Sequence, residues 1–202
     1  MTKSIVYLKN KKNLFLFIYI TLLLILPNCA RYKAQKLTPP QAPIHEKDNL
    51  VVAKKTLTED EAKKIFGGRK IIERGYTPVQ IYIKNKTDKT YYLNPNDIQA
   101  PLEASSNVAR KLHRSVGWKT AKYFIIGGPI WATIEGLSSY EANKTINTDF
   151  REKTVRLDEA IKIRPYGVVN KVMFIPNENY INDNLKITLT SPELKKRVMF
   201  DL

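Results

Sequence analysis

Residues 78–93, PVQIYIKNKTDKTYYL, decide the fold class of this chain. Apolar residues alternate with polar or amphipathic ones over residues 79–84, which is the two-residue period of a strand with one buried face. A polar stretch at residues 85–89 leads into a second short run, TYYL. This pattern predicts a β-hairpin, and the following residues 94–97, NPND, have the composition of a turn.

The rest of the chain offers several more short strands with the same kind of pattern. They are expected at residues 51–53, 161–164, 168–175, 185–190 and 197–202. Each alternating strand has one apolar face, so a second sheet must cover it. Strands of this length and spacing therefore predict an antiparallel β-sandwich.

Residues 103–155, between the two sets of strands, carry helical patterns instead. Ala142, Ile146 and Phe150 recur at a spacing of four, which places them on one face of a helix. Residues 138–141, SSYE, form a capping box at the start of that helix. We therefore predict a helical insertion in a mainly β domain, α+β overall.

A second capping box, TEDE at residues 58–61, predicts a helix with Thr58 as its N-cap. The helix should run to about Phe66 and end at Gly67 and Gly68. Its three acids could mimic a pair of catalytic carboxylates. We interpret them instead as first-turn acids that interact favourably with the helix dipole.

The N-terminal residues predict export. Residues 1–13 are polar and lysine-rich, and residues 14–26, LFLFIYITLLLIL, form a short apolar core. This core is shorter than the ~20 apolar residues that span a bilayer, so it has the pattern of a secretory signal. An uncleaved anchor and an ordinary secreted chain are the two alternatives.

Leu26-Pro27-Asn28-Cys29 resembles the lipobox of bacterial lipoproteins. The resemblance implies that the Cys29 thiol receives diacylglycerol, that the chain is cut just before it, and that the new amine is acylated. Ala30 in place of Asp implies sorting to the outer membrane, facing the periplasm. We therefore expect a signal peptide at 1–28, a lipidated N-terminus and tether at 29–49, and one domain at 50–202.

The short apolar strands and the stretch at residues 78–93 also resemble the immunoglobulin-like (Ig-like) sandwich modules of bacterial envelope lipoproteins. The resemblance covers about residues 50–102 and 156–202. It implies an Ig-like antiparallel β-sandwich. It implies no particular activity, because unrelated functions share this architecture.

Charge and motif content limit the functional classes. The formal net charge of +15 favours anionic partners such as phospholipid headgroups, acidic envelope polymers or nucleic acid. Export argues against nucleic acid.

Hydrolase-elbow, zinc-protease and P-loop motifs are missing from the sequence, and the lone cysteine cannot form a CxxC pair. We expect that the protein is not an enzyme and that it binds no cofactor or metal. The alternative is an enzyme of unrecognised type. The basic residues around His113 are interpreted as a solvated face; they are Arg110, Lys111, Arg114, Lys119 and Lys122.

The most distinctive apolar patch is residues 124–134, FIIGGPIWATI. We interpret it as helices that pack against the sandwich. The alternative is a hydrophobic hairpin that enters a membrane or a partner groove. The residues proposed for such contact are Trp118, Tyr123, Phe124, Ile130 and Trp131. The sequence thus predicts a lipid-anchored, non-enzymatic envelope protein that binds a partner or serves as a structural module.

Overall fold

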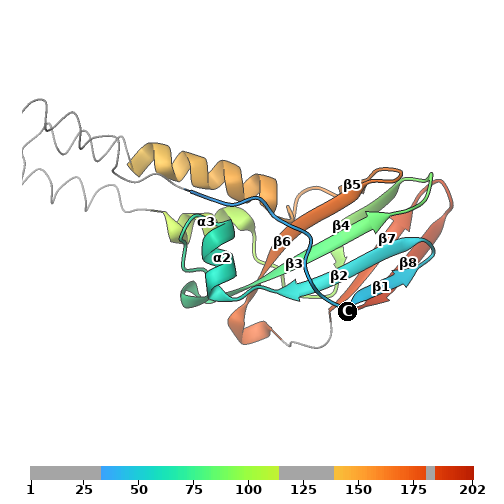
Figure 1. Cartoon of the computed structure of the whole chain (residues 1–202), viewed down its shortest axis with the longest axis horizontal. Helices are drawn as coiled ribbons and strands as arrows, with labels where there is room; N and C mark the ends of the chain where they lie inside the picture. The colour runs from blue at the N-terminus through green and yellow to red at the C-terminus, as the bar shows by residue number, and fades with distance from the viewer. Residues whose placement is uncertain (1–32, 114–138, 181–184) are drawn as a thin grey trace, which may run out of the picture. The chain divides into compact units, whose positions relative to one another are not determined.

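The computed structural model describes residues 33–113, 139–180 and 185–202. These residues form two antiparallel sheets and three helices, a mainly β, α+β fold (Figure 1). The strands are β1 (Ile44–Lys47), β2 (Leu50–Thr56), β3 (Tyr76–Asn85), β4 (Tyr91–Ile98), β5 (Ile161–Ile163), β6 (Val168–Pro176), β7 (Lys186–Ser191) and β8 (Lys196–Asp201). The helices are α2 (Glu59–Ile65), α3 (Ser105–Leu112) and a helix at residues 139–153. Within these residues, no helix combines the length and apolar character needed to cross a membrane.

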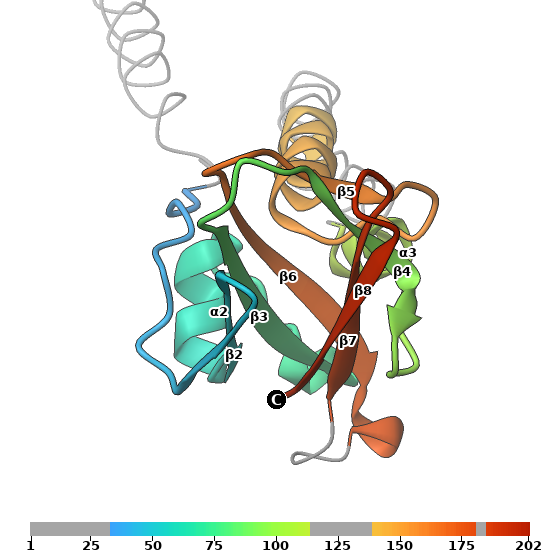
Figure 2. The same cartoon turned by 90° about the vertical axis from the view of Figure 1, so that its right-hand side faces the viewer.

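The two sheets have the strand orders β1-β2-β3-β6 and β5-β4-β7-β8, and every pairing is antiparallel. The chain passes from one sheet to the other after β3, after β5 and after β6. Figure 2 shows β2, β3 and β6 on one side and β4, β7 and β8 on the other. Each one-sided strand therefore finds its cover in the opposite sheet, as the alternating patterns predicted.

One hydrophobic cluster, here called the inter-sheet core, contains buried side chains of both sheets. Val79, Ile81 and Ile83 of β3 are fully buried in it, and Ile187 and Leu189 of β7 contribute from the second sheet. Its other buried members are Leu50, Val52, Tyr91, Leu93, Ile98, Val155, Ile163, Met173, Ile175, Leu185, Val198 and Phe200. Burial of this aliphatic surface is the main favourable term in folding.

The predicted hairpin at residues 78–93 is wrong. β3 pairs with β2 and β6, whereas β4 pairs with β5 and β7. The residues between them form a corner built around Asn85, which is completely buried. Its Nδ2 donates to the carbonyl oxygens of Lys89 and Arg164 at 2.7 and 3.0 Å, and its Oδ1 accepts from the Thr87 amide at 2.9 Å. Alternation reveals a buried face but does not identify the neighbouring strand.

The predicted turn at residues 94–97 is also wrong, because β4 continues through it to Ile98. The pairing of β4 with β7 shifts register between Leu93 and Ile98, which marks a bulge or local irregularity. Asn94 Nδ2 donates to Asp97 Oδ2 at 3.1 Å within this irregular stretch. Turn-forming residues are equally suited to a strand that locally departs from regular pairing.

Three helices and one face of the first sheet form a second cluster, here called the helix core. The rings of Phe66, Phe150 and Phe174 meet at its centre, with centroids 4.5 to 5.6 Å apart. They come from the end of α2, the helix at residues 139–153, and β6. The other buried members are Leu57, Ala62, Ile71, Tyr76, Val108, Ala109, Leu112, Ile146 and Val172.

The helix at α2 begins and ends as predicted. Thr58 is its N-cap, and the capping box with Glu61 is complete. Gly67 and Gly68 follow the helix with positive φ angles of 60° and 80°. The carbonyls left free in the last turn find partners elsewhere: Lys64 O accepts from the Gln35 amide, and Ile65 O accepts from Lys153 Nζ.

The helical insertion between β4 and β5 is confirmed for its described part, which contains α3 and residues 139–153. Ile146 and Phe150 are buried on one face, as their spacing predicted. The capping box at Ser138 lies outside the described residues.

The segment expected to be a tether, residues 29–49, contains structure in its described part. Strand β1 occupies Ile44–Lys47 and pairs with β2. Upstream of it, the Gln35 amide donates to Lys64 O at 2.9 Å, and Leu37 packs against the helix core. The Thr38 carbonyl accepts from Nε2 of the buried Gln80 at 2.7 Å. The chain is therefore attached to the domain from residue 35 onward.

Candidate functional site

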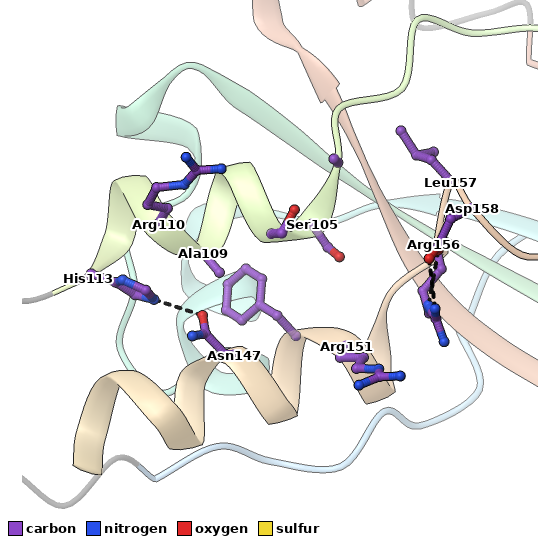
Figure 3. A pocket seen from close by; sticks show the side chains of 12 residues that line it. Ser105, Ala109, Arg110, His113, Asn147, Arg151, Arg156, Leu157 and Asp158 are labelled. Atoms are coloured by element: carbon purple, nitrogen blue, oxygen red, sulfur yellow. Dashed lines mark hydrogen bonds and ion pairs between the residues drawn. The ribbon is translucent and has the colours of Figure 1, made fainter. Parts of the chain in front are cut away.

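A groove of about 800 Å³ lies between α3 and the C-terminal part of the helix at residues 139–153. Its apolar lining includes Phe150, Ala109 and Ala104, of which the first two are buried in the helix core. Polar and charged side chains of both helices, together with Arg156 and Asp158, complete it (Figure 3). The packing of the helix core therefore determines the position of the groove walls, because the same helices form both the core and the groove.

A hydrogen bond joins the two helices at one end of the groove. His113, which follows α3, lies 2.7 Å from Asn147 on the opposite helix, measured between Nε2 and Oδ1. Figure 3 shows these two side chains pointing toward each other, with Arg110 on the same helix end as His113. Arg110 Nη2 donates to Asn107 Oδ1 at 2.7 Å. The remaining N–H groups of the Arg110 guanidinium take no part in this hydrogen bond.

An ion pair marks the other end of the groove. Arg156 donates from Nε and Nη2 to the two carboxylate oxygens of Asp158, at 3.1 and 2.8 Å. This hydrogen bonding lowers the pKa of Asp158 and raises that of Arg156. Arg156 Nη1 also lies 2.6 Å from Glu159 Oε2. Two acids therefore compensate the charge of this arginine.

Arg151 differs from Arg156 because it is exposed and makes no hydrogen bond or ion pair with another described residue. Its charge still acts on Asp158, whose pKa it helps to lower. Figure 3 shows it beside the Arg156–Asp158 pair. This end of the groove thus presents a guanidinium that no described residue engages by a hydrogen bond or ion pair, and its planar donors match carboxylate and phosphate groups.

The first turn of α3 adds hydrogen-bond donors to those that the arginine side chains provide in the groove. Ser105 and Ser106 line it, and both carry hydroxyl groups. Ala104, which precedes the helix, has a methyl side chain and cannot cap it. With an apolar floor, two serine hydroxyl groups, and Arg110 and Arg151, neither of which forms an ion pair within the described chain, the groove is suited to bind an anionic group next to apolar surface.

The predicted site residues have different positions relative to this groove. Arg110 and His113 line it, although the sequence suggested only a solvated face. Glu59 and Glu61 serve helix α2: Glu61 completes the capping box, and Glu59 Oε2 accepts from the Ile72 amide at 2.9 Å. The lipid-attachment residue and the proposed contact residues lie outside the described residues; they are Cys29, Trp118, Tyr123, Phe124, Ile130 and Trp131.

Asn147, Arg151 and Arg156 were missed as groove residues. A signal existed in the sequence, since Asn147 and Arg151 are four residues apart, directly beside the apolar stripe that contains Ile146 and Phe150. Polar residues at that spacing share one face of a helix. Which other helix faces them depends on tertiary packing, and no local pattern encodes it.

Comparisons of the chain with protein-family models, with curated proteins and with solved structures found no match. The chemistry of these residues and the N-terminal sequence are therefore the features that bear on function.

Proposed function

We propose that this protein is a lipid-anchored component of the bacterial cell envelope that acts by binding an anionic partner. The observation that carries the binding role is the groove lined by Arg110 and Arg151, neither of which forms an ion pair within the described chain. The apolar core at residues 14–26 and the lipobox-like residues before Cys29 support export and anchoring. Acyl chains of this kind hold a protein stably when several are present, at about 0.8 kcal/mol per buried CH₂.

We further propose that the sandwich is Ig-like. Strands β2, β3 and β6 in one sheet and β5, β4, β7 and β8 in the other follow the order of an Ig-like module with an added edge strand. The crossings after β3, β5 and β6 agree with this order. The described strands contain neither the tryptophan nor the cysteine pair of antibody domains. In this assignment, β1 and the helical insertion are additions to the module.

Intact mass spectrometry tests the anchor. The protein is taken from its native membrane beside a Cys29→Ala variant. We expect a mature chain that begins at Cys29 and carries added acyl mass, with no such species from the variant. A full-length chain without acyl mass from the unmodified gene would refute the anchor.

Crosslinking in native membranes tests the groove. Arg151→Gln removes one positive charge from the groove lining, and Arg164→Gln is the matched control. Arg164 is exposed and lies just after β5, outside the groove lining. We expect the first variant to lose a crosslinked species that the wild type and the control both form. Equal crosslinking by all three proteins would show that the groove does not bind the partner.

A further inference from the structure

The structure leaves a very short connection between the expected lipid anchor and the folded domain. The chain is attached to α2 at Gln35, through the 2.9 Å hydrogen bond to Lys64 O. Leu37 and Thr38 continue the attachment, through packing and through the bond from Gln80. Gln35 is six positions from Cys29 in the sequence, so their Cα atoms are at most about 22 Å apart. A lipid on Cys29 would therefore hold this end of the domain next to the membrane.

Three lysines surround the point of attachment. Lys33 and Lys36 flank Gln35 in the sequence, and Lys64 provides the carbonyl that Gln35 binds. All three are exposed and form no hydrogen bond or ion pair through their side chains with another described residue. By contrast, the neighbouring Lys63 lies 4.0 and 3.7 Å from the acids Glu59 and Asp60. The side chains of Lys33, Lys36 and Lys64 are here called the lysine patch.

We propose that the lysine patch binds the anionic phospholipid surface of the membrane that carries the anchor. This inference rests on the proposed acylation of Cys29. Charge and reach both support it: Lys33 is four residues from Cys29, at most about 14 Å along the chain. Attraction between basic residues and an anionic leaflet acts within about one Debye length, roughly 8 to 10 Å. The patch therefore turns the α2 end of the domain toward the bilayer.

The opposite end of the domain provides an internal control. β2 leads into α2, so the turn before β2 lies at the far end of that strand. Lys196 Nζ pairs with Asp48 Oδ1 at 2.8 Å, which places the β7–β8 turn beside that turn. Lys195 lies in the β7–β8 turn and is exposed. Its side chain forms no hydrogen bond or ion pair within the described chain. It should face away from the membrane.

Lysine acetylation measured by mass spectrometry tests the proposal on the full chain. The protein from native membranes, with its acyl mass verified, is reconstituted into vesicles of phosphatidylcholine alone or of phosphatidylcholine with phosphatidylglycerol. We expect acetylation of the patch lysines to be slowed by about fivefold in the anionic vesicles, and high salt to remove the effect. The acetylation rate of Lys195 should be the same in both.

Equal rates for the patch lysines in both kinds of vesicle, with the acyl mass present, would overturn the proposal and leave the anchor intact. Slowing of Lys195 together with the patch would also overturn it, because the surface contact would then not be specific to the α2 end. A chain without acyl mass would refute the anchor and this inference together, and the mass spectrum alone identifies that case.

Discussion

The inter-sheet core and the helix core are built from the same strand, β6, by different means. Met173 and Ile175 enter the inter-sheet core, whereas Val172 and Phe174 enter the helix core. The inter-sheet core joins strands, and each strand can be recognised from the alternation of apolar and polar residues within its own short sequence. The helix core joins Phe66, Phe150 and Phe174, which are far apart in the sequence. The inter-sheet core therefore closes the sandwich, while the helix core positions the groove and the N-terminal attachment.

Substitutions at two adjacent residues of β6 test whether the two cores are separate, and they should cause the largest losses of stability. Phe174→Ala should lower the free energy of unfolding by about 3 to 5 kcal/mol, because it leaves a cavity beside two aromatic rings. Ile175→Ala should cost about 2 to 5 kcal/mol by emptying space between the sheets. Urea unfolding measures both losses. Met199→Ala, at a side chain that is 52% exposed, serves as the control and should change little.

Hydrogen exchange should then separate the two variants. With Phe174→Ala, amide protection should fall mainly in α2 and in the helix at residues 139–153. With Ile175→Ala, it should fall mainly in β7 and β8. The same loss of protection across all elements in both variants would show that the inter-sheet core and the helix core unfold as one cooperative unit.

The corner at Asn85 connects the two sheets and does not belong to the helix core, so its loss should affect the sandwich alone. Asn85→Ala would remove the donor that the buried Asn85 side chain provides to the carbonyls of Lys89 and Arg164. We expect a loss of about 1 to 3 kcal/mol in the free energy of unfolding, measured by urea denaturation. Lys84→Ala, at the exposed preceding position, is the control. A loss no larger than that of the control would mean that the corner does not depend on this side chain.

Local patterns predicted the strands better than their neighbours. Alternation correctly identified the buried apolar residues of β3 and β7, and the long apolar run at residues 168–175 became β6, which is covered on both faces over residues 172–175. The false hairpin arose because Asn85 looks like a turn residue, while its side chain holds a corner between sheets. Gln80 looks like a solvent-facing residue, yet it is buried because the N-terminal segment covers it.

The groove was less predictable than the fold. Arg110 and Arg151 are 41 positions apart in the sequence, on helices that face each other only after both pack on β6. A basic residue gives the same local pattern on a solvated face and in a groove. The capping box at Thr58 was predictable for the opposite reason, since all its groups lie within four residues.

That capping box allows a smaller test confined to the helix core. Thr58→Ala removes the side-chain acceptor for the Glu61 amide and should cost about 1 kcal/mol of stability. Thr58→Ser keeps the hydroxyl and should retain most of the stability, as measured by thermal unfolding. Exchange should increase in α2 and not in β7. An equal increase in both would mean that α2 and the sandwich unfold only together.

The smallest expected effect comes from the charge of Glu61. Its pKa is lowered from 4.5, first by the hydrogen bond from Lys55 and then by that from the Thr58 amide. Because the folded pKa lies below the unfolded value, ionised Glu61 stabilises the folded state above about pH 4.5, and this contribution is lost as the pH falls through the folded pKa. Glu61→Gln keeps a capping-box acceptor and removes only the charge.

We therefore expect the wild type to exceed this variant in stability by no more than about 1 kcal/mol at pH 7, since the ion pair is partly exposed. The difference should be constant between pH 6 and 8 and should disappear in acid, measured by urea unfolding across the pH range. A difference that persisted below the folded pKa would mean that Glu61 acts through its shape and capping bonds, and that charge contributes nothing to this end of the helix core.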